Sequence, residues 1–530
     1  MSAPAALPPG SVVPLPTPAE MAAWDAAAMH NFGFHPHVLM ENAARAAFAV
    51  LEKLYGPLAG ARVHLYAGPG QNGGDALALA RLLDAAGADP LTLLARNRAR
   101  FRKSAAYNLR LADKLGLPIL PLSRAGRSLD ERPDILVDGL LGTGFRGPLS
   151  PDFAAFVAKI NAASKKTFVF SLDIPSGLDG LTGRPGPDAV RATATATFEA
   201  AKVGLFAPQA RPFTGRLHVC PIGIPAQVRA AHPASFAGLG PGIMDHVPAA
   251  SPLMHKGTAG KVLVVGGSPG LCGAPLLCAM GAMRAGAGLV TVACPAGIEP
   301  GVKAGRPEIM TAPLPETSPG AGWSADMAEA VRNMAAASDA VVIGPGLGRS
   351  RGAGEFLAAF FVPGPCPAPV ILDADALFFL ADAPDLSGRL WPGAVLTPHP
   401  GEMARLLSLS VAGVEADRPG AARTLAARSR AVVVLKGPGT LIVDGSDPAC
   451  PAILSPHAAP NLAVGGSGDV LAGVVARLLA AGRPPLLAAC LGVYWHGLCG
   501  ERLAGRFPRR GNTAVDIADA LPRAFRHPQP

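Results

Sequence analysis

The sequence lacks any pair of cysteines at the C-x-x-C spacing. Zinc ribbons and small disulfide scaffolds need closely spaced or framework cysteines, so neither class is indicated. The cysteines are single residues spread along the 530-residue chain: Cys220, Cys272, Cys278, Cys294, Cys366, Cys450, Cys490 and Cys499. This usage predicts reduced thiols and a cytoplasmic location.

A secretion signal and a long apolar run are also missing. Prolines interrupt the N-terminal residues, which have no basic start and no apolar core of a signal peptide. The most hydrophobic long segment, residues 271–294, contains Arg284 and consists largely of Gly and Ala, so it falls short of a membrane span. We expect no export and no membrane partner, and we interpret this segment as a buried helix followed by a strand.

Charged residues are scarce, at 16%, and the net charge of +9 is scattered along the chain. The densest basic cluster lies at residues 96–103 and has no interleaved aromatic residues. It therefore indicates a solvated face, or a mild attraction for anionic nucleotides, and argues against a nucleic-acid partner.

What the chain does have is a hydrophobic content of 49%, with 63 Gly and 55 Pro, which is typical of a globular, turn-rich protein. Its length favours two domains. Strand-like runs alternate with Ala/Leu-rich helical runs in both halves, which predicts the α/β class with parallel sheets covered by helices. The expected strands are residues 63–67, 91–94, 135–138 and 167–173, then 261–267, 340–344, 370–373 and 431–436.

No motif recurs between the halves, so we predict two different α/β domains and not a duplication. Gly, Pro, Ala and Ser crowd together over residues 230–252 without periodicity, which indicates a linker. We assign residues 1–235 and 253–530 to the two domains and residues 236–252 to the linker.

The most informative segment is G-G-S-G-D at residues 465–469, directly before an apolar helical run. Glycines let backbone N–H groups turn toward a phosphate, and the following helix adds the positive end of its dipole. Asp469 lies where a carboxylate could exchange a proton with a bound hydroxyl. The segment predicts chemistry at a hydroxyl beside a nucleotide phosphate.

Three loops follow consecutive predicted strands of the first half, where ligands bind in open parallel sheets. They are G-P-G-Q-N-G-G-D (68–75), D-G-L-L-G-T-G-F-R-G-P (138–148) and D-I-P-S-G-L-D (173–179). Their hard oxygen atoms suit an alkali or alkaline-earth ion and not zinc, although each carboxylate could equally be a loop tie. Asp173 is our candidate for proton transfer, with Lys202 as the alternative.

With these loops, residues 15–235 resemble the NAD(P)H-hydrate epimerase family, which implies a Rossmann-like three-layer α/β/α domain. The resemblance implies that Asn72, Asp138 and Ser176 bind a potassium ion. Thr197, Lys202, Gly204 and Leu205 fall in a later matching stretch. The implied substrate-binding residues are Gln71, Asn72, Gly73, Gly74, Asp75, Gly142, Thr143, Gly144, Phe145, Arg146, Gly147, Pro148 and Asp173. Gln71 and Ala76 depart from the family pattern.

Further loops follow the predicted strands of the second half. K-G-P-G-T (436–440) offers a lysine and flexible backbone to a phosphate, and T-P-H-P-G-E (397–402) holds His399 between prolines. G-P-G-L-G (344–348) is another glycine loop. In D-A-D-A-L (373–377) the two acids are alternate residues, so we doubt that both reach one ion.

This set, in order over the second half, resembles the ADP/ATP-dependent NAD(P)H-hydrate dehydratase family, a branch of the ribokinase-like α/β/α fold. The resemblance implies that Ala274, Gly348, His399 and Asp469 contact the hydrated dinucleotide. The implied ADP-binding residues are Lys436, Gly437, Pro438, Gly439, Thr440 and Gly468, with magnesium accompanying the nucleotide. The segment 459–464 departs from the family's N-P-G-M-A-T pattern.

The resemblances predict one bifunctional repair enzyme, an isomerase and a lyase acting on NADHX and NADPHX. The first half would interconvert the R and S hydrates, and the second would dehydrate the S form with ADP, Asp469 handling the proton. We also expect a homo-oligomer. Two alternatives stay open: a ribokinase-like kinase of hydroxymethylpyrimidine or sugar type with an accessory nucleotide-binding domain, and a first half that is a noncatalytic sensor.

Overall fold

The chain folds into two α/β units, of residues 14–237 and of residues 238–530 together with the first thirteen residues. The computed structural model describes residues 7–122, 132–145, 147–383 and 393–524. All eight cysteines are free thiols, and no helix among these residues is long and apolar enough to cross a membrane.

The N-terminal unit is built on a seven-stranded parallel sheet in the order β4-β3-β2-β5-β6-β7-β8. Its strands are β2 (Arg62–Ala67), β3 (Asp89–Leu94), β4 (Ile119–Pro121), β5 (Ile135–Gly139), β6 (Phe168–Leu172), β7 (Ala194–Phe198) and β8 (Arg216–Cys220). Its helices are α1 (Pro18–Phe32), α2 (Pro36–Tyr55), α3 (Gln71–Ala85), α4 (Lys103–Lys114), α5 (Pro151–Ala163), α6 (Val203–Phe206), α7 (Arg211–Thr214) and α8 (Ala226–Ala231).

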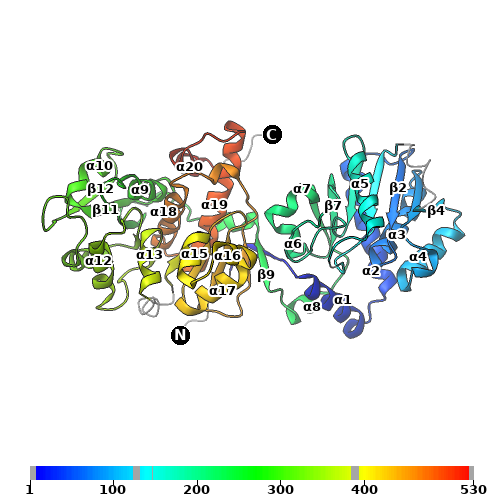
Figure 1. Cartoon of the computed structure of the whole chain (residues 1–530), viewed down its shortest axis with the longest axis horizontal. Helices are drawn as coiled ribbons and strands as arrows, with labels where there is room; N and C mark the ends of the chain where they lie inside the picture. Colours follow the sequence, from blue (N-terminus) through cyan, green and yellow to red (C-terminus); the bar gives the residue numbers. More distant parts are fainter. Residues whose placement is uncertain (1–6, 123–131, 146, 384–392, 525–530) are drawn as a thin grey trace. The chain divides into compact units, whose positions relative to one another are not determined.

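Alternation along the strands makes this unit three-layered. Val63 and Leu65 of β2 pack into the core under α1, α2, α3 and α4, while Tyr66 packs into the core under α5 (Figure 1). Successive strand residues point to opposite faces, so a continuously apolar strand buries both. The sheet and its helical layers confirm the predicted fold class.

The C-terminal unit contains an eleven-stranded sheet in the order β1-β9-β18-β17-β16-β15-β14-β13-β10-β11-β12. The run from β12 to β16 is parallel, and β16-β17-β18 is antiparallel. Its strands are β1 (Val12–Pro14), β9 (Phe236–Leu239), β10 (Lys261–Val265), β11 (Leu289–Pro295), β12 (Met310–Leu314), β13 (Ala340–Ile343), β14 (Val370–Leu372), β15 (Val395–Leu396), β16 (Val432–Leu435), β17 (Leu441–Asp444) and β18 (Ala452–Leu454).

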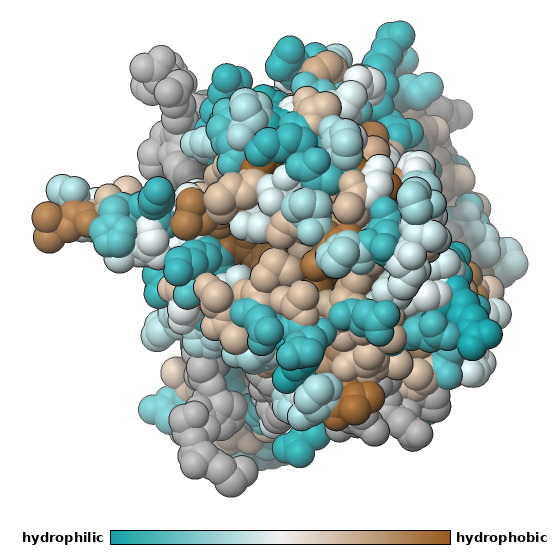
Figure 2. Space-filling view, turned by 90° about the vertical axis from the view of Figure 1, so that its left-hand side faces the viewer, coloured by the Kyte–Doolittle hydropathy of each residue, from teal (hydrophilic) through white to brown (hydrophobic). Residues whose placement is uncertain are grey.

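Helices cover both faces of this sheet (Figure 1). They are α9 (Gly273–Arg284), α10 (Glu299–Lys303), α11 (Ala328–Ala336), α12 (Arg351–Phe361), α13 (Asp375–Asp382), α15 (Pro400–Leu407), α16 (Val411–Ala416), α17 (Arg418–Ser429), α18 (Ser467–Ala480), α19 (Pro485–Arg506) and α20 (Ala514–Ala520). Figure 2 shows the end of the unit where β12 is the edge strand, with hydrophilic residues around a paler, more apolar centre.

Close packing of α9 on α18 sets the position of the predicted anion site. A Cβ on Gly473 would lie 2.0 Å from the carbonyl oxygen of Cys278, and one on Gly281 would lie 2.4 Å from that of Val470. Only glycine lets the two backbones approach this closely. The interpretation of residues 271–294 as a buried helix and a strand is confirmed by α9 and β11.

The irregular linker expected over residues 236–252 differs from the structure. Residues 236–239 form β9, and Pro241–His246 form a short 3-10 helix. The amide of Gly240 donates to the carbonyl of Ser11, 2.9 Å away, next to the paired strands β1 and β9. Strands this short carry too few residues for a period to be recognised in the sequence.

Candidate functional site

A cavity of about 500 Å³ lies at the carboxyl edge of the N-terminal sheet. One wall comes from α1 and α2 and includes Met21, Asp25 and Leu39. The other wall comes from the loops after the strands. Of the predicted substrate-binding residues, those that line the cavity are Gln71, Asn72, Asp75, Gly142, Thr143, Gly144, Phe145 and Asp173.

The remaining predicted residues of this half have other places. Gly73 and Gly74 are buried in the first turn of α3, while Gly147 and Pro148 are exposed and do not line the cavity. Arg146 lies outside the described residues. A Cβ on Gly73 would lie 1.8 Å from the carbonyl oxygen of Gly68, so the strand β2 can turn directly into α3 only with glycine here.

Asn72, Asp138 and Ser176 belong to one buried polar cluster. The Ser176 hydroxyl donates to Asp138 Oδ1 at 2.6 Å and the Ser176 amide to Asp138 Oδ2 at 2.8 Å. The Asn72 amide group donates to the carbonyls of Leu141 at 2.8 Å and Leu172 at 3.0 Å. Burial raises the pKa of Asp138, against the lowering effect of these hydrogen bonds.

The side-chain oxygen of Asn72 is buried and accepts no hydrogen bond from any described residue. A buried acceptor without a donor is costly unless a ligand satisfies it. An amide oxygen beside a carboxylate and a serine hydroxyl is the donor set that an alkali cation accepts. The cluster therefore fits the predicted potassium site, although Asp138 is already bonded to donors on both oxygens.

Asp173 follows β6 with a left-handed backbone, φ 59°. Its Oδ1 accepts hydrogen bonds from the buried ammonium of Lys202 and, at 3.4 Å, from the amide of Phe198. Lys202 also donates to Thr197 at 3.1 Å. The two candidates for proton transfer, Asp173 and Lys202, are thus one ion pair at the cavity. Gly204 and Leu205 instead pack in the interior of the unit.

Two further carboxyl groups lie near this ion pair. Asp75 is fully buried, and burial together with the charges of Asp173 and Asp25 raises its pKa well above the ordinary value. Asp25, on α1, was missed by the sequence analysis. Burial, Asp173 and Glu199 raise its pKa to about 6, and Lys202 opposes the rise.

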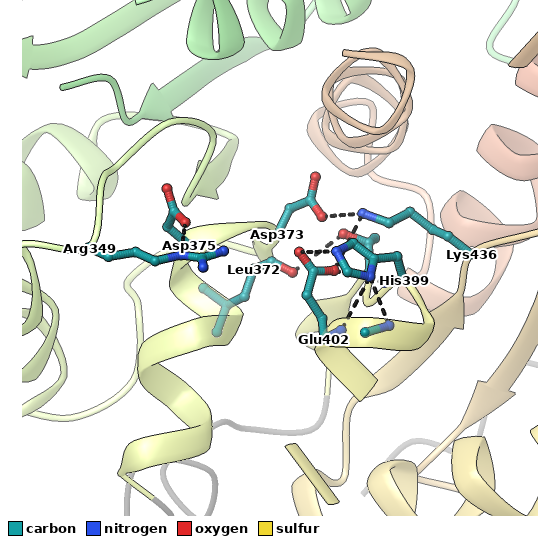
Figure 3. Close-up of polar contacts among 9 residues, drawn as sticks. Arg349, Leu372, Asp373, Asp375, His399, Glu402 and Lys436 are labelled. Carbon is teal, nitrogen blue, oxygen red and sulfur yellow. Dashed lines mark hydrogen bonds and ion pairs between the residues drawn. The ribbon is translucent and has the colours of Figure 1, made fainter. Parts of the chain in front are cut away.

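In the C-terminal unit, Lys436 lies at the end of β16 and faces carboxylates from other strand ends. Its ammonium donates to Asp373 Oδ1 at 2.6 Å and lies 3.9 Å from Glu402 Oε2; Figure 3 shows Asp373 and Lys436 pointing toward one another. Burial alone would lower the pKa of Lys436, but Asp373 and Glu402 raise it overall.

His399 and Glu402 form the capped start of α15. His399 Nδ1 accepts from the amide of Gly401 at 2.9 Å, and Glu402 Oε2 accepts from the amide of His399 at 2.7 Å. Burial, followed by Lys436, lowers the pKa of His399, while burial raises that of Glu402 to about 7 against the opposing charge of Lys436. The predicted rigid loop around His399 is thus a helix cap beside Lys436.

Asp469 is in the first turn of α18, after the N-cap Gly466. Burial and the charge of Asp373 raise the pKa of Asp469 to about 7, and Lys436 opposes the rise. A Cβ on Gly468 would lie 3.3 Å from the ammonium of Lys436. The two predicted phosphate loops of this unit therefore meet at Lys436, with a carboxyl group that titrates near neutral pH beside them.

The loop after Lys436 is a turn between the antiparallel strands β16 and β17. Gly437 and Gly439 have positive φ, 132° and 66°, and the Thr440 hydroxyl donates to the carbonyl of Gly437 at 3.0 Å. Arg418, which the sequence analysis missed, donates to the carbonyl of Lys436 at 3.1 Å. Only a contact across the fold reveals that role.

Asp375 points away from Asp373, as the sequence analysis argued. Asp375 accepts from Arg349 at 2.9 Å and from the amide of Gly348 at 3.0 Å (Figure 3). No described group of three or more His, Cys, Asp or Glu side chains could hold a metal ion. Ala274 lies at the start of α9, where a Cβ on Gly346 would come 3.2 Å from its own Cβ.

Comparison with known proteins gives matches to each half and to the whole chain. Residues 36–204 match a family described as the YjeF-related protein N-terminus, and residues 262–523 match NAD(P)H-hydrate dehydratase. The chain is 38% identical over 97% of its length to the bifunctional NAD(P)H-hydrate repair enzyme Nnr of Moorella thermoacetica, also 97% covered, and 36% identical over 92% of its length to that of Coxiella burnetii, 94% covered. It is similar to the ADP/ATP-dependent NAD(P)H-hydrate dehydratase of Bacillus subtilis crystallised with ATP and magnesium, with 29% identity, 53% of this chain and 96% of that chain covered, and a TM-score of 0.43.

Proposed function

The chain belongs to the family of bifunctional NAD(P)H-hydrate repair enzymes, and from that membership we propose that its two units restore hydrated NADH and NADPH in succession. The N-terminal unit interconverts the R and S hydrates, and the C-terminal unit dehydrates the S form with ADP. In class terms these are an isomerase and a lyase. The observation that carries the proposal is the family match over nearly the whole chain, because it includes both halves.

In the N-terminal unit we assign the reacting ring to the cavity. The amides at the start of α3 have no partner inside the helix and lie beside a lining loop, which suits the pyrophosphate. Asp173 is the base, because Lys202 favours the charged carboxylate. Asn72, Asp138 and Ser176 would hold a potassium ion, which would offset the buried charge of Asp138 when bound.

In the C-terminal unit we assign ADP to the Lys436–Thr440 turn and Gly468, where an ammonium and two glycines with positive φ can approach phosphate oxygens. Bound ADP would supply negative charge and phosphate oxygens next to the reacting ring. We assign the hydrated ring to the neighbourhood of Ala274, Gly348 and His399. No described carboxylate cluster offers magnesium a site of its own, so we assign it no protein ligands.

Asp469 is the residue to which we assign proton transfer in dehydration. The hydroxyl leaves as water when it receives a proton, the ring nitrogen lone pair forms the new bond to the ring carbon, and the 1,4-dihydropyridine returns after a ring proton is lost. A carboxyl group with a pKa of about 7 is partly protonated at neutral pH and can give that proton. The predicted homo-oligomer and cytoplasmic location stay predictions.

The test follows absorbance at the dihydronicotinamide band from a mixture of R and S hydrates with ADP. We expect full recovery with the whole protein, recovery of the S fraction alone with Asp173→Asn, and no recovery with Asp469→Asn. Asp84→Asn, at an exposed position of α3, is the matched control and should behave as the wild type. Turnover with ATP alone and a phosphorylated product would instead indicate the ribokinase-like kinase.

A further inference from the structure

The helical wall of the N-terminal cavity presents one acidic side chain among apolar ones. Met21, Asp25 and Met29 are spaced by four residues along α1, and all three line the cavity. The neighbouring lining residues of α2 are Pro36, Leu39, Met40 and Ala43. An ionisable group in the middle of an apolar helix stripe costs stability unless it is used.

Contacts outside the cavity fix the orientation of α1. Thr17 and Glu20 form a capping box at its start, and the Trp24 indole donates to the carbonyl of His232 at 2.7 Å. The amide of Ser235 donates to Glu20 at 3.1 Å. Asp25 follows the anchored Trp24 directly, so the helix cannot rotate it away from the cavity without breaking these bonds.

Four charged or titratable groups face Asp25 from the surrounding elements: Lys202, Asp173, Glu199 and Asp75. Lys202 is bonded to Asp173 and Thr197, and Glu199 is bonded to Arg229. No hydrogen bond or ion pair with another described residue holds the Asp25 carboxyl group. Burial and the negative neighbours raise the pKa of Asp25 to about 6, within reach of physiological pH.

We propose that Asp25 is the second proton-exchanging group of this cavity, acting from the helical wall while Asp173 acts from the sheet edge. The inference rests on the function proposed above. A hydroxyl-bearing carbon next to a ring nitrogen inverts without redox chemistry when the ring opens and closes on the other face. Such a reaction needs a proton taken at one atom and given at another, so a single carboxylate is not sufficient.

The step balances as follows from the two groups. The hydroxyl loses its proton to Asp173, the carbon–oxygen bond becomes a carbonyl, and the carbon–nitrogen bond breaks. The electron pair of that bond goes to the ring nitrogen, which takes a proton from Asp25. Closure on the opposite face reverses each transfer, so Asp173 and Asp25 regain their starting states and no other reactant is consumed.

The experiment uses the full chain without ADP and follows the conversion of purified R hydrate to S by chromatography. Asp25→Asn keeps the size of the side chain but cannot exchange a proton, and we expect the rate to fall about a hundredfold or more. In the wild type the rate should fall as the pH rises through about 6, because Asp25 must be protonated, and this dependence should be absent from the residual activity of the variant. Asp25→Glu keeps a carboxyl group and should retain much of the rate.

The control is Asp84→Asn, which removes a carboxylate from the exposed face of α3 and should leave the rate unchanged. Near-ultraviolet circular dichroism checks that each variant is folded. Unchanged conversion in folded Asp25→Asn, or loss of conversion in folded Asp25→Glu with unchanged pH dependence in Asp25→Asn, would overturn the proposal. A wild-type protein that does not interconvert the hydrates would refute the proposed epimerisation, and the role of Asp25 with it.

Discussion

The charges around Asp469 predict how the pH dependence of dehydration responds to two opposite substitutions. Asp373 raises the pKa of Asp469, and Lys436 lowers it. Asp373→Asn removes a negative neighbour, so the Asp469 carboxyl should ionise more easily and its pKa should fall. Lys436→Met removes a positive neighbour, so the pKa should rise.

The size of the effect follows from the pKa of about 7. If dehydration needs protonated Asp469, its rate falls as the pH rises through 7, and about 9% of the carboxyl is protonated at pH 8. Neighbouring charges shift a pKa by about one unit or more, which corresponds to about 1.4 kcal/mol. With a pKa of about 6, Asp373→Asn would leave about 1% protonated at pH 8, an additional loss of about ninefold relative to its own activity at pH 5. Lys436→Met should move the midpoint toward about 8.

The assay is the initial rate of dehydration of purified S hydrate from pH 5 to 9 at saturating ADP, because Lys436 lies in the proposed ADP turn. Glu402 also has a pKa raised to about 7, so Glu402→Gln identifies the titrating group. A transition that persists in Glu402→Gln belongs to Asp469. Midpoints that move in the same direction in Asp373→Asn and Lys436→Met, or a rate that rises with pH through 7, would refute the reasoning.

Three further predictions concern the N-terminal unit. Gly73→Ala should destabilise it by about 3 kcal/mol, since the new Cβ would lie 1.8 Å from the Gly68 oxygen, whereas Gly70→Ala meets no atom within 4 Å; urea unfolding compares the two, and equal midpoints would contradict the packing argument. Replacing potassium by N-methylglucamine should slow R-to-S conversion and leave dehydration of S hydrate unchanged, and the effect should be absent in Asn72→Leu; an unchanged wild-type rate would argue against the site. Lys202→Met should slow conversion about a hundredfold, because Asp173 loses the cation that keeps it ionised; chromatography of the epimers measures this, and a near-normal rate would exclude the ion pair from the reaction.

The strand-end loops could be predicted from sequence because their chemistry is local. Glycines and hydrogen-bonding side chains directly after apolar runs indicated which segments meet at a sheet edge, and Asn72, Asp138 and Ser176 do belong to one cluster. The same argument separated Asp373 from Asp375, which the structure places on Lys436 and Arg349. Rules about strand direction are sufficient for such residues.

Residues that reach a site from a distant segment could not be predicted in this way. Arg418 supports the Lys436 turn from α17, and the sequence gives no sign of the pairing. Asp25 does have a signal, since it interrupts the stripe of Met21 and Met29, but only the packing of α1 shows which cavity the stripe faces. The pKa values of Asp469 and Glu402 depend on burial and on neighbours brought together by folding.

The pairing of β1 with β9 has a consequence for how the protein is made. The first strand to leave the ribosome belongs to the sheet of the C-terminal unit, so the whole N-terminal unit is, in sequence terms, an insertion within its neighbour. β1 must wait for more than two hundred residues of synthesis before its partner exists. A gene fragment that starts at residue 253 would lack both strands and expose the edge of β18, and a fragment that ends at residue 235 would keep β1 without β9. Dividing this chain into its two activities should therefore begin at residue 236, with β1 supplied in trans or replaced by a capping mutation on β9.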